Sequence, residues 1–206
     1  MKEPAEVQIV WQEERRCLTL EGETVLEYVL CWPKVEGGGL GGRWISRYYA
    51  HLARSWRQRW EREVYWCACL ELAARRESAR PFVPWRGELG GETVLLRDGV
   101  LSLRFHGSEI RGDSRPARVR WGDVWTLGEG APKPLHSLFR TQRGWRSRLW
   151  EAVFRQGEAR RQSGDCFLDV NWRKKAKAAR PFRGWCLTEA GVEISLPQCA
   201  AAPAAE

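Results

Sequence analysis

The sequence predicts an α+β fold in which an antiparallel β-sheet packs against two amphipathic helices. Helical periodicity runs through Trp44–Arg76 and again through Gly144–Gln162, where apolar residues recur every three or four positions. Other segments alternate apolar and polar residues, as half-buried strands do. Because most of these alternating segments follow the long helix, we expect hairpin-connected strands in an antiparallel sheet.

Composition indicates one globular domain over residues 1–206, since 43% of the residues are hydrophobic and 29% are charged. No apolar stretch is long enough to span a bilayer, and Met1–Glu6 lacks the apolar core of a signal peptide. The seven cysteines are odd in number and scattered, which favours free thiols in a reducing compartment. We therefore expect a cytoplasmic chain.

Before the long helix, the pattern predicts a hairpin of Val7–Trp11 and Cys17–Leu20, and then a strand over Thr24–Trp32 that ends at Pro33. The glycine-rich run Gly37–Gly42 separates that strand from the helix. The helix is expected to bury one apolar stripe against the sheet. The stripe consists of Ile45, Tyr48, Tyr49, Leu52, Trp56, Trp60, Val64 and Cys67.

After the long helix, alternation predicts strands at Glu92–Leu96, Val100–Phe105 and Ala117–Leu127, with a turn at Arg97–Gly99 between the first two. The second helix follows, and then come an extended piece at Cys166–Val170, a basic loop at Asn171–Pro181 and a closing hairpin at Trp185–Leu196.

The residues that carry most enzyme chemistry are sparse and badly spaced for it. His51, His106 and His136 are the three histidines, and none lies in a zinc-binding pattern. Cys67 and Cys69 are one residue too close for a Cys-x-x-Cys pair, and no nucleophile elbow is present. We expect no metal, no cofactor and no catalytic activity.

Four stretches lie in order between about Thr24 and Pro203: Gly42–Tyr49, Pro81–Trp85, Arg120–Phe139 and Gly184–Cys199. Together they resemble, in the same order, the ectodomain of RsiV-type anti-sigma factors. Gly42–Tyr49 is similar to the family's glycine-preceded helix start, and Pro81–Trp85 to the exit from that helix. Arg120–Phe139 looks like a strand, a glycine turn and an entry to a helix. Gly184–Cys199 resembles the closing hairpin, which leads into a Pro-Gln loop.

The resemblance implies a binding domain, because the family's ectodomain is a receptor for lysozyme. The implied contact residues lie in the loop after the last strand. They are Pro197, Gln198, Cys199, Pro203 and Ala204. The positions of the family's Pro-Tyr loop map here to Cys199, Pro203 and Ala204, and the exchange of tyrosine for cysteine or alanine removes side chains that commonly anchor interfaces. A chain cut from such an ectodomain would be extracytoplasmic.

Two other kinds of partner remain open from the sequence. The formal net charge of +8, with basic stretches at Arg111–Arg120, Arg140–Arg148 and Arg173–Arg183, favours nucleic acid or another anionic partner. The sequence also ends before the family's final strand. An open sheet edge beside Pro197–Pro203 would then accept a partner strand or a second copy of the chain.

Overall fold

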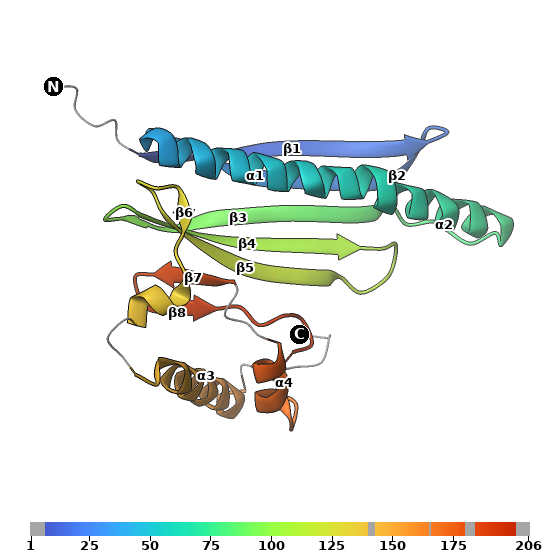
Figure 1. The fold of residues 1–206 in the computed structure, drawn as a ribbon. Coiled ribbons are helices and arrows are strands. Elements are labelled where there is room, and N and C mark those ends of the chain that lie inside the picture. The colour runs from blue at the N-terminus through green and yellow to red at the C-terminus, as the bar shows by residue number, and fades with distance from the viewer. Residues whose placement is uncertain (1–6, 140–142, 165, 180–183, 201–206) are drawn as a thin grey trace.

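The computed structural model describes residues 7–139, 143–164, 166–179 and 184–200. A six-stranded sheet is the main structure of this described part (Figure 1). In order across the sheet, its strands are β1 (Gln8–Leu20), β2 (Glu23–Glu36), β3 (Trp85–Arg97), β4 (Val100–Ile110), β5 (Ala117–Thr126) and β6 (Ala131–Pro132). The α+β class with an antiparallel sheet is confirmed. One neighbouring pair, β2 and β3, runs parallel because a long helical connection crosses back over the sheet between them.

The crossing connection is one helical rod built from α1 (Gly39–Arg59), a π-helical turn η1 (Trp60–Val64) and α2 (Tyr65–Glu77). Most of its buried side chains recur in steps of four, at Ile45, Tyr49, Ala53, Trp60, Val64, Ala68 and Leu72, and Cys69 is buried beside them. Steps of four exceed the 3.6 residues of an α-helical turn, so an unbroken α-helix would rotate this stripe away from the sheet. The wider π turn takes up the excess and keeps the stripe on the sheet.

The predicted long helix is confirmed, but two members of its predicted stripe are not in the core. Tyr48 is 48% exposed, and Cys67 also faces solvent. Tyr48 lies three residues after Ile45, and Cys67 lies three residues after Val64. The buried stripe instead advances by four residues from each of these positions. The neighbours Tyr49 and Ala68 are the buried residues at these turns.

The N-terminal strands are longer than predicted. The charged residues Glu13–Arg16 continue β1 rather than turn it, because this edge strand leaves Glu13, Arg15 and Arg16 exposed, and Glu14 bonds Arg57 of the rod. Pro33 lies inside β2. The Val35 N–H bonds the Ser46 hydroxyl at 2.8 Å, so the Pro33 nitrogen, two residues earlier, also points away from β1. Pairing with β3 stops at Leu30, and Pro33 therefore costs the sheet no ladder bond.

The closing hairpin of β7 (Trp185–Thr188) and β8 (Gly191–Ile194) packs on the sheet face opposite the rod. The Ser102 hydroxyl accepts the Leu187 N–H at 2.8 Å, and the Cys186 thiol donates to the Leu103 carbonyl at 3.3 Å. Gly122 is the closest point of approach, since a Cβ there would overlap the Cys186 sulfur and the Trp185 backbone. The hairpin thus depends on the absence of a side chain at Gly122.

The remaining elements are a short 3-10 turn η2 (Leu135–Phe139), α3 (Trp145–Gln162) and α4 (Trp172–Ala178). The predicted second helix is confirmed as α3. It packs beneath the β7–β8 hairpin, which Figure 1 shows between it and the main sheet. The predicted basic loop at Asn171–Pro181 is wrong within its described residues, because Trp172 and Ala176 bury one face of α4. The predicted extended piece at Cys166–Val170 forms no strand.

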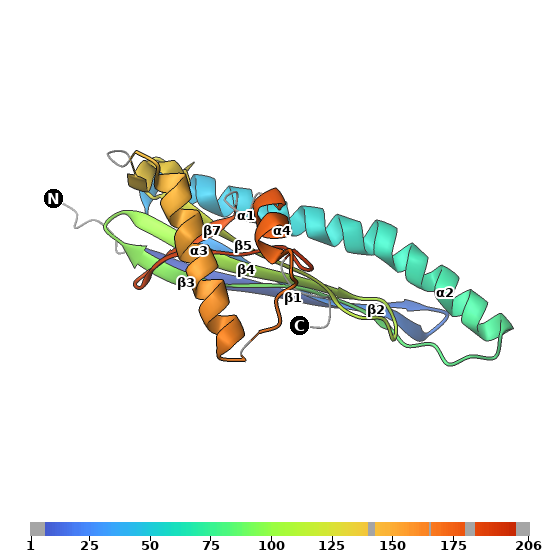
Figure 2. The ribbon, with the colours of Figure 1, turned by 90° about the horizontal axis from the view of Figure 1, so that it is seen from below.

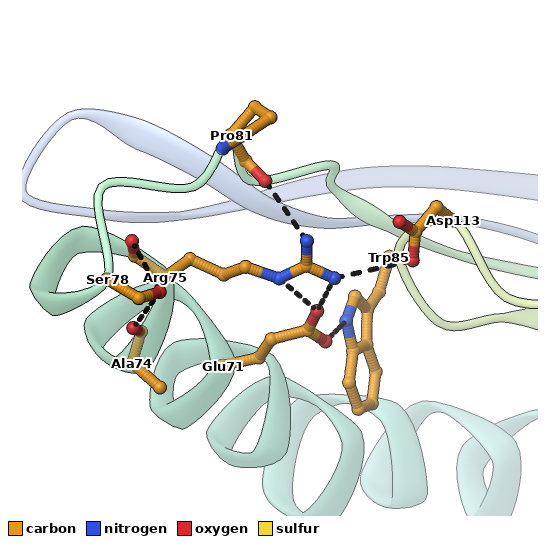
Figure 3. A network of polar contacts seen from close by, with 7 residues as sticks. All are labelled: Glu71, Ala74, Arg75, Ser78, Pro81, Trp85 and Asp113. Carbon is orange, nitrogen blue, oxygen red and sulfur yellow. Dashed lines mark hydrogen bonds and ion pairs between the residues drawn. The ribbon is translucent and has the colours of Figure 1, made fainter.

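A polar network fastens the projecting end of α2 to the sheet (Figure 3). The Arg75 guanidinium donates to Glu71 at 3.1 Å, to the Pro81 carbonyl at 3.4 Å and to Asp113 at 3.3 Å. The other Glu71 oxygen accepts the Trp85 indole N–H at 2.7 Å. One arginine therefore joins the helix, the segment between α2 and β3, and the β4–β5 turn.

Candidate functional site

One face of the sheet is only partly covered. The rod covers the other face, and the β7–β8 hairpin covers this one over β4 and β5 near Ser102 and Gly122 (Figure 2). A groove of about 610 Å³ lies on the uncovered part, towards the β1–β2 turn. The side chains of its strand positions on this face are Arg15, Cys17, Glu27, Val29, Arg86, Glu88, Ser108 and Ile110.

Pairs of polar side chains line this face. Glu13 accepts from Arg15 at 2.5 Å, and this hydrogen bond lowers the pKa of the Glu13 carboxyl. Glu88 lies 3.4 Å from the His106 ring nitrogen on the neighbouring strand. Such exposed pairs contribute little to stability, yet they present donors and acceptors in a fixed pattern. The face is therefore suited to recognition of a polar surface.

Cys31, which lies beside this groove, is not an activated nucleophile. Burial, and then the charge of Glu13, raise the pKa of the Cys31 thiol. A protonated thiol is a poor nucleophile. Within the described ranges, no serine or cysteine side chain hydrogen-bonds a histidine ring, and no three histidine, cysteine or acidic side chains group as a metal site.

The predicted loop runs beside the edge of the sheet. The Gln198 side-chain oxygen accepts the Arg118 N–H of β5 at 2.8 Å, and its amide nitrogen donates to the Pro116 carbonyl at 3.1 Å. Gln198 therefore occupies backbone groups that a neighbouring strand would otherwise bond. In the part of the chain that the structure describes, β6 pairs with β5 only at Trp125 and Thr126.

The structure describes two of the other predicted loop residues, Pro197 and Cys199. Pro197 and Cys199 are exposed, and Cys199 has a φ of 64°, a left-handed conformation that is unfavourable for a side chain other than glycine. The Ala200 N–H bonds the Pro197 carbonyl at 3.0 Å and closes a turn. Pro203 and Ala204 lie outside the described residues.

The structure thus brings Gln198 to the end of β5 that borders the groove, since Ser108 of the groove pairs with Arg118. The groove residues Arg86 and Glu88 lie outside the predicted strand, which begins only at Glu92, whereas β3 begins at Trp85. The alternation of charged Arg86 and Glu88 with uncharged residues from Trp85 to Leu89 is the sequence signal that predicts this earlier start.

Comparisons with known proteins support the fold. No protein-family model matches the sequence, and no curated protein matches it either. Two crystal structures of DUF3298 family proteins have similar folds. The protein from Pseudomonas aeruginosa aligns with 98% of this chain and 86% of its own length, at a TM-score of 0.60 and 12% identity. The chain shares the DUF3298 fold.

The DUF3298 protein from Bacteroides fragilis aligns with 78% of this chain and 71% of its own, at a TM-score of 0.59 and 12% identity. At such identity the likeness concerns the fold alone. Within the described residues, no helix is long and apolar enough to cross a membrane.

Proposed function

We propose that this chain is a non-catalytic protein-binding domain. Its contact surface consists of the described loop Pro197–Ala200 and the groove on the uncovered sheet face. The observation that carries the proposal is the double hydrogen bond of Gln198 to the end of β5. This bond holds an exposed loop at the border of a preformed groove, so little ordering is required of the loop on binding.

The groove supports a protein partner more than a small substrate. Its charged side chains alternate in sign, as in Glu27, Arg86 and Glu88, and the apolar side chains of Val29 and Ile110 lie among them. A shallow surface of mixed charge is typical of the polar part of a protein interface. Lysozyme is the first partner to test, because the resemblance to RsiV-type ectodomains implies it.

The test is a calorimetric titration of lysozyme into the full chain and into a version that ends after Leu196. We expect the full chain to bind lysozyme. Truncation should weaken binding at least about tenfold, because it removes the loop together with Gln198, the side chain that anchors the loop to Arg118. Equal binding by the two chains would remove the loop from the site. Absence of binding to the full chain would remove lysozyme as the partner.

A matched pair of variants tests the groove. Arg86→Ala removes an exposed cation inside it, whereas Arg97→Ala removes an exposed cation at the far end of the same strand. We expect Arg86→Ala to weaken lysozyme binding at least about tenfold and Arg97→Ala less than about twofold. Equal losses would indicate attraction by overall charge, and would contradict a groove-specific contact.

A further inference from the structure

A second cleft, of about 600 Å³, lies in the C-terminal region and shares no lining residue with the groove. It is formed between the β6–η2 connection, the start of α3 and α4. The residues that matter for its chemistry are Lys133, His136, Trp145, Arg146, Trp150 and Lys177. The fold therefore joins two of the basic stretches, around Arg146 and Lys177, that lie far apart in the sequence.

The charge of this cleft is of one sign. None of the residues that line it is acidic, and Lys133, Arg146 and Lys177 take part in no ion pair within the described residues. The first turn of α3 also holds no acidic residue, and no side chain caps it. Its N-terminal N–H groups add to the positive potential that Arg146 creates there.

Aromatic rings, rather than carboxylates, hold two of the cations. The Arg146 guanidinium carbon lies 5.3 Å from the centre of the Trp145 ring, and the Lys177 ammonium lies 5.2 Å from that of Phe154. Trp145 itself stacks flat on Phe139 at 5.1 Å, and Trp150 stacks on Phe154 at 5.3 Å. A cation–π contact orients a cation and leaves its charge uncompensated, so an anion can still bind it.

We propose that this cleft binds a nucleotide unit, that is, a phosphate joined through a sugar to a planar base. Arg146 and Lys177 would bind the phosphate, and the indoles of Trp145 and Trp150 provide the apolar wall for the base. The volume lies within the range of small-ligand pockets. The same unit occurs in a free nucleotide and in single-stranded nucleic acid, and the experiment separates these two sources.

The experiment measures the affinity of AMP by calorimetry, and that of a labelled oligothymidylate of about ten nucleotides by fluorescence anisotropy, both at low salt. The cleft variant is Arg146→Gln with Lys177→Gln. The control is Arg155→Gln with Lys174→Gln, which removes the same charge from exposed positions of the same two helices outside the cleft. Circular dichroism establishes that both variants are folded.

We expect the cleft variant to lose at least about tenfold in affinity and the control to lose less than about twofold. Comparable affinity for AMP and the oligonucleotide would identify a free nucleotide as the source. Much tighter binding of the oligonucleotide would identify a single strand. Three results would overturn the proposal: no binding of either probe, equal losses in the two variants, or competition by inorganic phosphate as strong as that by AMP. None of these depends on lysozyme binding.

Discussion

The body formed by the sheet and the rod differs from the C-terminal region in how it places aromatic and charged side chains. The four largest fully buried side chains, Trp60, Tyr28, Tyr49 and Phe105, all belong to the body. By contrast, α3 has no buried residue over its 18 positions. These four aromatic rings of the body are fully buried, although Trp44, Tyr48 and Trp66 on the outer side of the rod are exposed. Several aromatic rings of the C-terminal region stay half-exposed around a cleft.

The cations that cross-link the body also differ from those of the cleft, although Arg161, Arg173 and Lys175 of the C-terminal region form ion pairs. Body arginines such as Arg57, Arg59 and Arg76 bond carboxylates on other elements, for example Glu14 and Glu109. The cations of the C-terminal cleft take part in no ion pair in the described part of the chain. The comparison indicates that the body supplies most of the stability, and that the C-terminal region holds charge available for a ligand.

Trp60→Ala is expected to have the largest effect. Trp60 is fully buried between the rod and Gly87, so its removal should lower the free energy of unfolding by about 3–5 kcal/mol in urea denaturation. Trp172→Ala, in the smaller cluster of the C-terminal region, should cost less. A larger loss for Trp172→Ala would contradict the division between the two regions.

Gly122→Ala should break the contact between the regions. The added methyl group overlaps the backbone of Trp185, which cannot rotate away, so we expect a loss of about 1–3 kcal/mol in thermal or urea unfolding. Gly128→Ala is the matched control. A Cβ there meets nothing within 4 Å, and the change should be neutral within about 0.5 kcal/mol. Equal effects would show that the hairpin is not held at Gly122.

Asp123→Asn is expected to change the pH dependence of stability in the body. Asp123 accepts the Tyr49 hydroxyl at 2.9 Å, and Tyr49 accepts the Trp125 indole N–H at 2.7 Å. Burial raises the pKa of the Asp123 carboxyl. The native state therefore binds this proton more tightly than the unfolded chain, and the contribution of Asp123 to stability falls as pH rises from the unfolded pKa through the raised one.

In Asp123→Asn this fall should disappear, because the amide stays neutral and still accepts the tyrosine hydroxyl. Burial raises the pKa values of Tyr48 and Tyr49. Burial also raises the pKa of the Cys186 thiol, to about 11. None of these groups titrates in the same acidic window. Urea denaturation at several pH values between about 3 and 7 measures the difference between the two proteins. Parallel pH profiles would refute the account of Asp123.

Gln198→Ala should have the smallest effect on stability. Both of its hydrogen bonds lie at the exposed end of β5, so we expect a loss below about 1 kcal/mol. Exchange of the Arg118 amide hydrogen should nevertheless become faster, because its acceptor is gone. Unchanged exchange at Arg118 would mean that the loop is not anchored there.

The sequence predicted the elements whose pattern is long and regular. The rod was recognised because its stripe runs through many turns, and β4 and β5 because their apolar positions alternate. The course of β1 was missed, since an edge strand with exposed charged residues lacks that alternation. The seven-residue helix α4 was missed because its lysines dominate so short a segment.

The two candidate sites depend on contacts between distant segments, which no local pattern records. Gln198 meets Arg118 across the β5 edge, and Arg146 and Lys177 line one cleft only after α3 and α4 pack together. Motifs within single segments could therefore indicate basic charge and a loop, but not their geometry.

Native-state hydrogen exchange of the unsubstituted protein tests the central claim most directly. If the body and the C-terminal region differ as described, amides of β2–β4 exchange only through global unfolding, and amides of α3 and α4 exchange through local opening at lower free energy. As the urea concentration rises, the exchange free energies of the two groups of amides should converge, because global unfolding becomes the dominant route of exchange. A single exchange free energy for α3, α4 and β2–β4 in the absence of urea would contradict the claim.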